Sequence, residues 1–322
     1  MKRTLLNTIT ALAGLSLTAA FSPSAQALLI VPTFDSSITG DPNSASIILG
    51  ITNAIAQIDS YIANPITVDI IFQQSNVGVG SSSVSSYGIF YGGYISTLQN
   101  NQVLSAADTQ ALSTLPGGPN NPVNGSNAIT LTSSLLQALG VPVSDSSTIT
   151  LNTSFMNYLR TGPQDPSKAD LQSVVMHEIC ETLGSGGQGS HAGTSDIGDL
   201  DLFRYSAPGV RSFSADPNAS SYFSIDSGVT NLRNFNQNGV GDYGDWAVGA
   251  TPHVQDAFAT LGSRPDLDSV EITALDIIGY DLTPAGTALQ TAVPEPTSLA
   301  LMTAGLTAAA SLRKRKKPSQ NR

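Results

Sequence analysis

The sequence predicts an α+β domain, and three observations carry the prediction. Isoleucines recur every three or four residues between positions 44 and 63, which is typical of an amphipathic helix. Two runs rich in β-branched residues, 66–72 and 147–155, alternate as strands do. Two later segments, 171–183 and 268–279, carry the apolar stripes and end signals of helices. Helices and strands therefore both contribute to the expected fold.

The first half of the chain divides into alternating helical and extended segments. The expected elements are a first strand at 28–34, the helix 44–63, the strand 66–72, a Tyr- and Gly-rich strand at 86–95, short helices at 104–114 and 127–139, and the strand 147–155. The two short helices are joined by a loop at 115–126 that is rich in Gly, Pro and Asn.

The second half is organised around one apolar helix. Asp165-Pro166 is a helix start signal, and Gly184 is placed to end the helix in a left-handed turn. A Gly/Ser/Asp loop at 185–201 and a stretch of short strands and loops at 202–250 are expected to follow. Asp268 and Glu271 form a capping-box pair for the last helix, which Gly279 ends.

Residues 1–27 are predicted to be a secretory signal peptide. Lys2 and Arg3 precede an apolar run from Leu5 to Phe21, and Ser24-Ala-Gln-Ala27 is a small-residue cleavage site for signal peptidase. The mature chain is therefore expected to begin near Leu28. The alternative is an N-terminal membrane anchor.

The C-terminus carries a second predicted targeting signal. Pro294-Glu295-Pro296 precedes an apolar run at 299–312 and the basic cluster 313–317. The run is shorter than the ~20 residues of a comfortable membrane span, and the basic cluster obeys the positive-inside rule. The segment 293–322 resembles a PEP-CTERM sorting signal. The resemblance implies a Gram-negative host, transient inner-membrane insertion of a short transmembrane helix, recognition by an exosortase, and release or attachment outside the cell. The alternative is a simple tail anchor.

The charge of the chain limits the classes of partner that it can bind, and its cysteine content limits the disulfides that it can form. Between 28 and 292 the chain has six Lys and Arg against 23 Asp and Glu, a formal charge of −17. Such acidity argues against nucleic acid and anionic membrane surfaces as partners and suits an exported protein that binds divalent cations. The single cysteine, Cys180, excludes an internal disulfide.

The sequence His177-Glu178-Ile-Cys-Glu181 is the strongest functional signal. Side chains four residues apart lie on one helix face, so His177 and Glu181 can hold one metal ion. Histidine and glutamate are both zinc ligands. Glu178 projects beside them, where it can act as a general base. A helix of this kind, a strand at 148–154 and the segment Leu275–Tyr280 together resemble the metzincin group of zincins, with Glu181 in place of the second histidine.

That resemblance implies a zincin-like catalytic domain over 28–283, followed by a linker at 284–292. It also implies a mixed twisted sheet, an active-site helix, a C-terminal helix and an edge strand at 148–154 that pairs with an extended peptide substrate. The block Asp201–Gly209 resembles exported metalloproteases that bear the same tail. Two features depart from the pattern: Gly187 stands where metzincins place the third ligand, and no methionine follows the motif helix before the tail.

Several residues are candidates for the missing ligand and for supporting roles. His191 and Asp201 are the leading candidates for the third metal ligand, and Asp196 and Asp199 lie close to them. Tyr205 is a candidate transition-state donor with a buried structural role as the alternative, and Cys180 is either a ligand or a small buried side chain. His253 is expected to be a surface residue. The acidic loops 193–201 and 236–245 could bind calcium, although solvated turns are the alternative.

Two functions are consistent with these features. The first is an exported zinc metallopeptidase in which Glu178 is the general base and a peptide or protein is the substrate. The second is a non-catalytic zincin-fold protein of the extracellular matrix or of adhesion. The absent third ligand at Gly187 favours the second function, and the motif helix favours the first.

Overall fold

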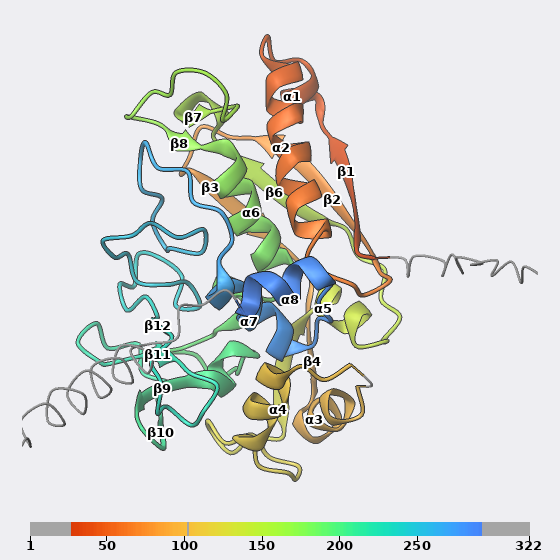
Figure 1. The fold of residues 1–322 in the computed structure, drawn as a ribbon, viewed down its shortest axis with the longest axis vertical. Helices are drawn as coiled ribbons and strands as arrows, with labels where there is room; N and C mark the ends of the chain where they lie inside the picture. The colour runs from red at the N-terminus through yellow and green to blue at the C-terminus, as the bar shows by residue number, and fades with distance from the viewer. Residues whose placement is uncertain (1–26, 102, 292–322) are drawn as a thin grey trace, which may run out of the picture.

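The protein contains helices and strands in comparable measure, which confirms the α+β prediction. A computed structural model describes residues 27–101 and 103–291, and these are the residues drawn in colour in Figure 1. Residues 1–26 of the predicted signal peptide and the predicted sorting signal from residue 293 lie outside the described residues.

A four-stranded mixed sheet forms the frame of the first half. It contains β1 (Leu29–Phe34), β2 (Thr67–Gln74), β6 (Ser147–Leu151) and β3 (Gly80–Ser83), in the order β1-β2-β6-β3. The first three strands are parallel, and β3 is antiparallel to β6. The expectation of an edge strand at 148–154 is therefore wrong. Strand β6 has a paired strand on each side, and the edge strands are β1 and β3.

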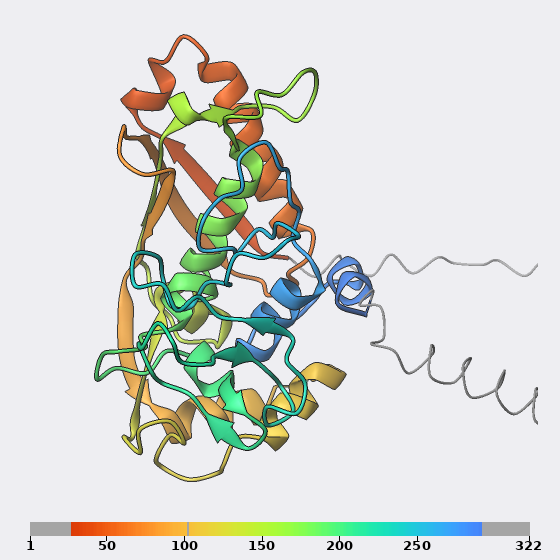
Figure 2. The ribbon, with the colours of Figure 1, turned by 90° about the vertical axis from the view of Figure 1, so that its left-hand side faces the viewer.

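Two helices cover one face of this sheet. In Figure 2 the sheet lies on the left, with α2 (Ser44–Asp59) and α6 (Leu171–Thr182) on one side of it. Alternate residues of β2 lie on the same face of the sheet, and three of them, Val68, Ile70 and Phe72, are buried. Helix α2 ends at Asp59 rather than 63, and Ile62 forms a bridge with Leu282. The helices and the sheet bury the apolar core between them.

Two predicted elements are each half strand and half helix. The segment expected as a strand at 86–95 is β4 (Ser86–Phe90) followed at once by α3 (Tyr91–Gln99). The segment expected as a helix at 127–139 is β5 (Ala128–Thr132) followed by α5 (Ser133–Ala138). Strands β4 and β5 pair antiparallel, and the Thr132 side chain caps α5 by accepting a hydrogen bond from the Leu135 N–H.

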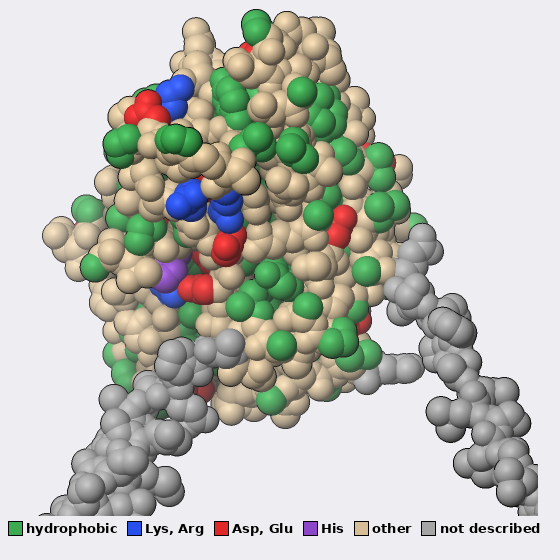
Figure 3. Space-filling view, turned by 45° about the horizontal axis from the view of Figure 1, so that its top comes forward, with side chains coloured by type: hydrophobic (Ala, Val, Ile, Leu, Met, Phe, Trp, Pro, Cys, Tyr) green, Lys and Arg blue, Asp and Glu red, His purple; other side chains and the backbone are tan. Residues whose placement is uncertain are grey.

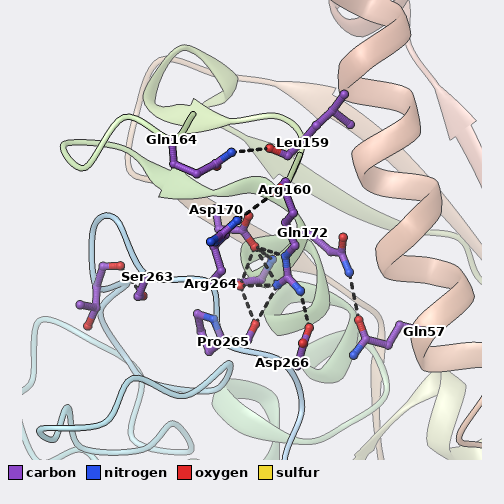
Figure 4. A network of polar contacts seen from close by, with 12 residues as sticks. Gln57, Leu159, Arg160, Gln164, Asp170, Gln172, Ser263, Arg264, Pro265 and Asp266 are labelled. Atoms are coloured by element: carbon purple, nitrogen blue, oxygen red, sulfur yellow. Dashed lines mark hydrogen bonds and ion pairs between the residues drawn. The ribbon is translucent and has the colours of Figure 1, made fainter. Parts of the chain in front are cut away.

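Helix α6 begins at Leu171, later than the Asp165-Pro166 signal suggested. Asp170 is its N-cap and accepts hydrogen bonds from the backbone N–H and the hydroxyl of Ser173. Arg160 donates to the same carboxylate at 2.9 Å and also bonds the Pro265 carbonyl and Asp266 (Figure 4). This network therefore ties the start of α6 to the segment that leads into the last helices.

The end of α6 follows the prediction. Gly184 has a φ of +95°, and its N–H donates to the Glu181 carbonyl while Ser185 N–H donates to the Cys180 carbonyl. These two bonds are the pair of a Schellman motif, in which the left-handed residue is normally glycine. The chain then reverses into the 185–201 loop, so that Glu181 sits one turn before the reversal.

The rest of the second half consists of loops, short elements and two last helices. Its elements are β8 (Ala169–Asp170), η2 (Gly186–Gly189), η3 (Leu200–Phe203), β9 (Arg204–Ala207), β10 (Val210–Arg211), β11 (Tyr222–Phe223), β12 (Arg233–Asn234), α7 (Ser269–Ile278) and α8 (Pro284–Thr291). The first half also contains α1 (Ser36–Thr39), α4 (Ala106–Ser113), η1 (Thr153–Phe155) and β7 (Met156–Asn157). The short strands at 202–250 and the capping box of Asp268 and Glu271 are as predicted. In Figure 1 the loops of the second half, coloured teal to light blue, lie beside α6. Most side chains of α6 are buried.

The segment 284–291 departs from the expectation of a linker. It forms helix α8, whose first turn is capped when the Thr283 hydroxyl accepts a hydrogen bond from Gly286 N–H. Gln290 donates to Asp276 of α7 at 2.7 Å, so α8 is joined to the helix before it. The described fold therefore extends to residue 291.

Charged side chains are sparse on the surface. Most of the face in Figure 3 is uncharged, and its few basic side chains lie beside acidic ones. Arg160 with Asp266 and Arg233 with Asp268 are examples of such pairs. With few cations available, acidic side chains that lack such a partner are the ones that can bind an external cation.

Candidate metal centre

His177 and Glu181 converge on a third side chain, Asp245, which lies far along the chain. The Nε2 atom of His177 is 3.6 Å from Glu181 Oε1 and 3.7 Å from Asp245 Oδ2. Two ligands of a tetrahedral zinc ion with bonds of about 2.1 Å lie about 3.4 Å apart. The two distances from His177 Nε2 are therefore close to that spacing. The groups of side chains whose ligand atoms all lie within 4.8 Å of one another in the described structure are His177, Glu178 and Glu181, and Glu181, Asp242 and Asp245, so Glu181 belongs to both.

Each of these three side chains is held from behind by a hydrogen bond on its other polar atom. His177 Nδ1 lies 2.9 Å from the Val254 carbonyl, which makes Nδ1 a donor and leaves Nε2 facing the two carboxylates. Ser82 Oγ donates to Glu181 Oε2 at 2.7 Å. Gln255 Nε2 donates to Asp245 Oδ1 at 3.0 Å. Such outer hydrogen bonds are the usual support of metal ligands, because they fix which atom faces the ion.

The segment 254–255 supplies two of these supports. Its position depends on α7, because the Gln255 N–H donates to the buried Glu271 carboxylate at 2.8 Å. Glu271 is also the N3 residue of the capping box of α7. The start of the last long helix thereby fixes the side chains around His177 and Asp245. The two ends of the loop that carries Asp245 are joined by a hydrogen bond from the Asn236 N–H to the Asp245 carbonyl.

Glu178 lies beside the three converging residues. One of its ligand atoms is within 4.8 Å of ligand atoms of His177 and Glu181. Its side chain abuts Gly80 of β3, where any larger residue would collide with it. Oε2 of Glu178 is buried without a hydrogen-bond partner among the described residues. An unpartnered buried carboxylate oxygen is costly unless it serves a ligand or a reaction.

The protonation equilibria reflect the crowding of acids around one imidazole. Burial alone would lower the pKa of His177, but Asp245 and Glu181 outweigh it and hold that pKa well above its ordinary value. Burial raises the pKa of Glu178 well above its usual range, and burial raises the pKa of Asp245 to about 7. For Glu181, burial is outweighed by the hydrogen bond with His177, and its pKa is lowered. The site therefore binds extra protons in the absence of a cation, as a cation-binding site should.

The sequence candidates for the third ligand lie elsewhere. Asp201 accepts hydrogen bonds from Ser190 Oγ, from His191 N–H and from Gly198 N–H, and it pairs with the Arg204 Nε at 3.5 Å. Neither Asp201 nor His191 belongs to a metal-binding group within the part of the chain that the structure describes. Those bonds occupy the Asp201 carboxylate, which is fully buried. The structure brings together His177, Glu178 and Glu181, and it adds Asp245 to them.

The other candidate residues are packed in the core or bonded to residues outside the His177 cluster. Tyr205 is buried under the Arg211 guanidinium, whose carbon lies 4.8 Å from the ring centroid, and it does not line the groove described below. Cys180 is a buried side chain of the core. His253 is half-buried and bonds Asp268 at 2.9 Å. Gly187, the position of the third ligand in the resembled family, lies against Glu181 and Asp242, where a side chain would collide with both.

The acidic loop 236–245 contributes in a way that sequence reasoning only partly foresees. The sequence indicates a candidate calcium loop there, and the loop supplies both Asp242 and Asp245 next to Glu181. The signal in the sequence is the pair of aspartates in Asp242-Tyr-Gly-Asp245. The other acidic loop, 193–201, forms no metal-binding group among the residues described.

A groove runs along α6 past these residues. It has a volume of about 690 Å³, and its lining includes β3 and residues between 253 and 265. His177, Glu178 and Glu181 also line it. Strand β3 pairs only with β6 among the described strands, so its outer backbone groups face the groove side and can pair with an extended chain.

The C-terminus matches a known sorting motif. A family model described as a PEP-CTERM protein-sorting motif matches residues 292–316. The sorting motif supports export through the membrane to the cell surface or the extracellular space, and it implies recognition by an exosortase-type sorting enzyme. The motif residues Pro294, Glu295 and Pro296 fall within the match. No curated protein and no solved structure matches the chain.

The membrane helix expected at 299–312 lies outside the described residues and stays a prediction. Within 27–101 and 103–291, the structure contains no helix whose length and apolarity would allow it to span a bilayer.

Proposed function

We propose that the protein is an exported zinc-dependent peptidase whose metal is held by His177, Glu181 and Asp245. The observation that carries the proposal is the approach of two buried carboxylates to one imidazole nitrogen. Glu181 Oε1 and Asp245 Oδ2 lie 3.6 and 3.7 Å from His177 Nε2, and the other polar atom of each of the three side chains is held by a separate hydrogen bond.

The donor set fits zinc. One imidazole nitrogen and two carboxylates are the ligand types of catalytic zinc sites that hold three protein ligands and leave a position open. The side chain of His177 is 16% exposed, and the groove gives access to it. When bound, zinc would supply a Lewis acid that polarises a carbonyl and acidifies water. Two anionic ligands lower that acidity relative to a set of neutral histidines, so we expect a slow or specialised enzyme.

Glu178 is the general base of this proposal. It is buried, it lies directly beside the ligands, and its Oε2 has no partner in the described structure. An unpartnered carboxylate oxygen at this place can accept a proton from the attacking water and pass it to the leaving amine. Its Oε1 lies so close to Gly80 that a side chain there would collide with it, and Glu178 lines the groove.

Strand β3 binds the substrate in this proposal, in place of the strand 148–154. An extended peptide laid along the edge of β3 would pair with free backbone groups and pass over Glu178. Gly80 and Ser82 both line the groove, and Ser82 also supports Glu181. Substrate strand and metal ligand are thereby fixed relative to each other.

The proposal is tested by comparing wild type, Glu178→Gln and a chelated sample on an unfolded protein substrate. Glu178→Gln should keep zinc and fold but lose about 10²–10⁴-fold in rate, which is the usual contribution of a general base. A zinc-loaded wild type that is no more active than Glu178→Gln would leave the non-catalytic matrix or adhesion function instead. Loss of zinc from Glu178→Gln would make Glu178 a ligand and overturn its role as the base.

A further inference from the structure

The groove has a marked charge asymmetry. Its lining includes no lysine or arginine, although it contains the ligands, Glu178 and further aspartates. Much of the remaining lining is apolar or small, for example Phe155, Ala257, Phe258 and Leu261. Two other acidic residues of the lining already have partners: Asp170 is paired with Arg160 at 2.8 Å, and Asp256 accepts a hydrogen bond from the His253 N–H.

Asp242 is a further acidic residue of the groove lining. Its side chain accepts no hydrogen bond and forms no ion pair within the described part of the chain. It is exposed at the rim, yet one carboxylate oxygen lies within 4.8 Å of ligand atoms of Glu181 and Asp245. A carboxylate kept this close to two others favours a cationic partner.

Hydrogen bonds to the backbone of its loop fix the position of Asp242. The Asn236 side chain donates to the Asp242 carbonyl at 3.0 Å and to the Asn238 carbonyl at 3.0 Å. The buried Arg204 guanidinium, stacked on Phe235, donates to the Tyr243 carbonyl. Gly187 has no side chain to obstruct Asp242. The loop therefore presents a rigid, unpartnered carboxylate at the mouth of the groove.

We propose that Asp242 selects substrates with a lysine or arginine next to the scissile bond. The proposal rests on the peptidase function above and assigns its substrate class: peptides with a basic side chain on one side of the bond and an apolar or small side chain on the other. A substrate side chain suits Asp242 better than a second metal ion does, because Asp242 is exposed. The inner atoms of its buried neighbours, Glu181 and Asp245, already face His177 Nε2.

The test uses matched peptides that carry Lys, Ala or Glu at each position flanking one fixed scissile bond. The zinc-loaded exported protein should prefer Lys over Glu at one flanking position by about tenfold in kcat/KM at low salt, since an exposed ion pair and its like-charge reversal are each worth a few-fold. The preference should shrink as salt is added. Asp242→Asn should bring the ratio close to one, and Asp242→Lys should invert it.

Asp69→Asn is the matched control, because Asp69 is an exposed aspartate of β2 that does not line the groove. It changes the net charge equally and should retain the preference. Binding of the same peptides to the Glu178→Gln form reports selectivity without turnover. An unselective wild type, or a preference that survives Asp242→Asn, would overturn the assignment. Loss of zinc from Asp242→Asn would also overturn it, by making Asp242 a ligand. Selective binding with no hydrolysis in wild type would support the role of Asp242 in selecting basic side chains and would contradict the peptidase function.

Discussion

Ser82 and Glu181, 99 residues apart in the chain, are joined by a hydrogen bond of 2.7 Å from the serine hydroxyl to Glu181 Oε2. The bond links the edge strand β3 to the motif helix α6 at the point where Glu181 faces His177. The register of β3 on β6, with Ser82 opposite Ile149, sets the height of this hydroxyl along the helix. The geometry of the metal ligand therefore depends on a strand that also forms the groove wall.

Replacing Ser82 by alanine should weaken zinc binding without unfolding the protein. Loss of a hydrogen bond behind a ligand typically lowers metal affinity by about 10–100-fold. The measurement is a competition titration of zinc against a chromogenic chelator. Ser83→Ala is the control, since Ser83 is exposed and lies outside the groove. Equal zinc affinity in the Ser82→Ala and Ser83→Ala proteins would show that this hydroxyl does not support the ligand.

The parts of the fold with strong periodicity were predictable from sequence. Helix α2 and strand β2 follow their apolar patterns closely. Helix α3 was missed although Tyr91, Tyr94, Ile95 and Leu98 have helical spacing, because Gly92 and Gly93 and the preceding strand masked it. Strand β3, Gly80–Ser83, has no strand-forming residues and exists because β6 supplies its partner. Local propensity could not reveal it.

Replacing Arg160 by leucine should destabilise the protein by about 2–4 kcal/mol, because Asp170 would keep a buried charge without its cation. Arg160 is 21% exposed, so we expect the lower end of this range. Chemical denaturation of the variant measures the change. Arg264→Ala should cost about 1 kcal/mol or less, because Arg264 makes only an exposed bond to the Arg160 carbonyl. Equal losses in the two variants would contradict the role given to the network in Figure 4.

Asp108 should make stability fall as pH rises toward neutrality. Burial, followed by repulsion from Asp276, raises its pKa from 3.8 to about 7. The folded state then binds the proton more tightly than the unfolded state. Its stabilising contribution is complete below about pH 4 and is lost as pH rises to about 7. Asp108→Asn should therefore flatten the decline in unfolding free energy by up to about 1.4 kcal/mol per pH unit within that window.

Denaturation of wild type and Asp108→Asn in urea at several pH values between about 4 and 8 checks this prediction. The Ser105 N–H, which donates to Asp108 Oδ2 at 2.9 Å, can still bond the asparagine oxygen, so the helix cap is kept. Parallel curves for the two proteins over the whole range would show that Asp108 titrates at its ordinary pKa in the folded state.

The candidate site was half visible in the sequence. His177, Glu178 and Glu181 are neighbours on one helix, so local spacing alone placed them together. The third converging residue, Asp245, comes from a loop whose position depends on Asn236, Gln255 and the capping box of α7. These are tertiary contacts between distant segments. Proximity along the chain instead favoured His191 and Asp201, and Asp201 is occupied by Arg204 and Ser190.

The sorting motif predicts that the exported protein lacks its C-terminal tail. Mass spectrometry of protein recovered outside the cell should find peptides from the described region up to residue 291 but none from 299–322. Changing Pro294, Glu295 and Pro296 to alanine should leave the tail attached and hold the protein in the membrane fraction. Recovery of an intact C-terminus from wild-type protein outside the cell would contradict sorting by an exosortase.

Zinc content of the Asp245→Ala protein tests the central claim most directly. Wild type should carry about one zinc per chain by elemental analysis. Asp245→Ala and His177→Ala should both lose it, because each removes one of the three converging atoms. His191→Ala and Asp201→Asn, which change the residues that the sequence favoured, should keep it where they fold. Zinc retained by Asp245→Ala but lost from His191→Ala would contradict the assignment of His177, Glu181 and Asp245 as the metal centre.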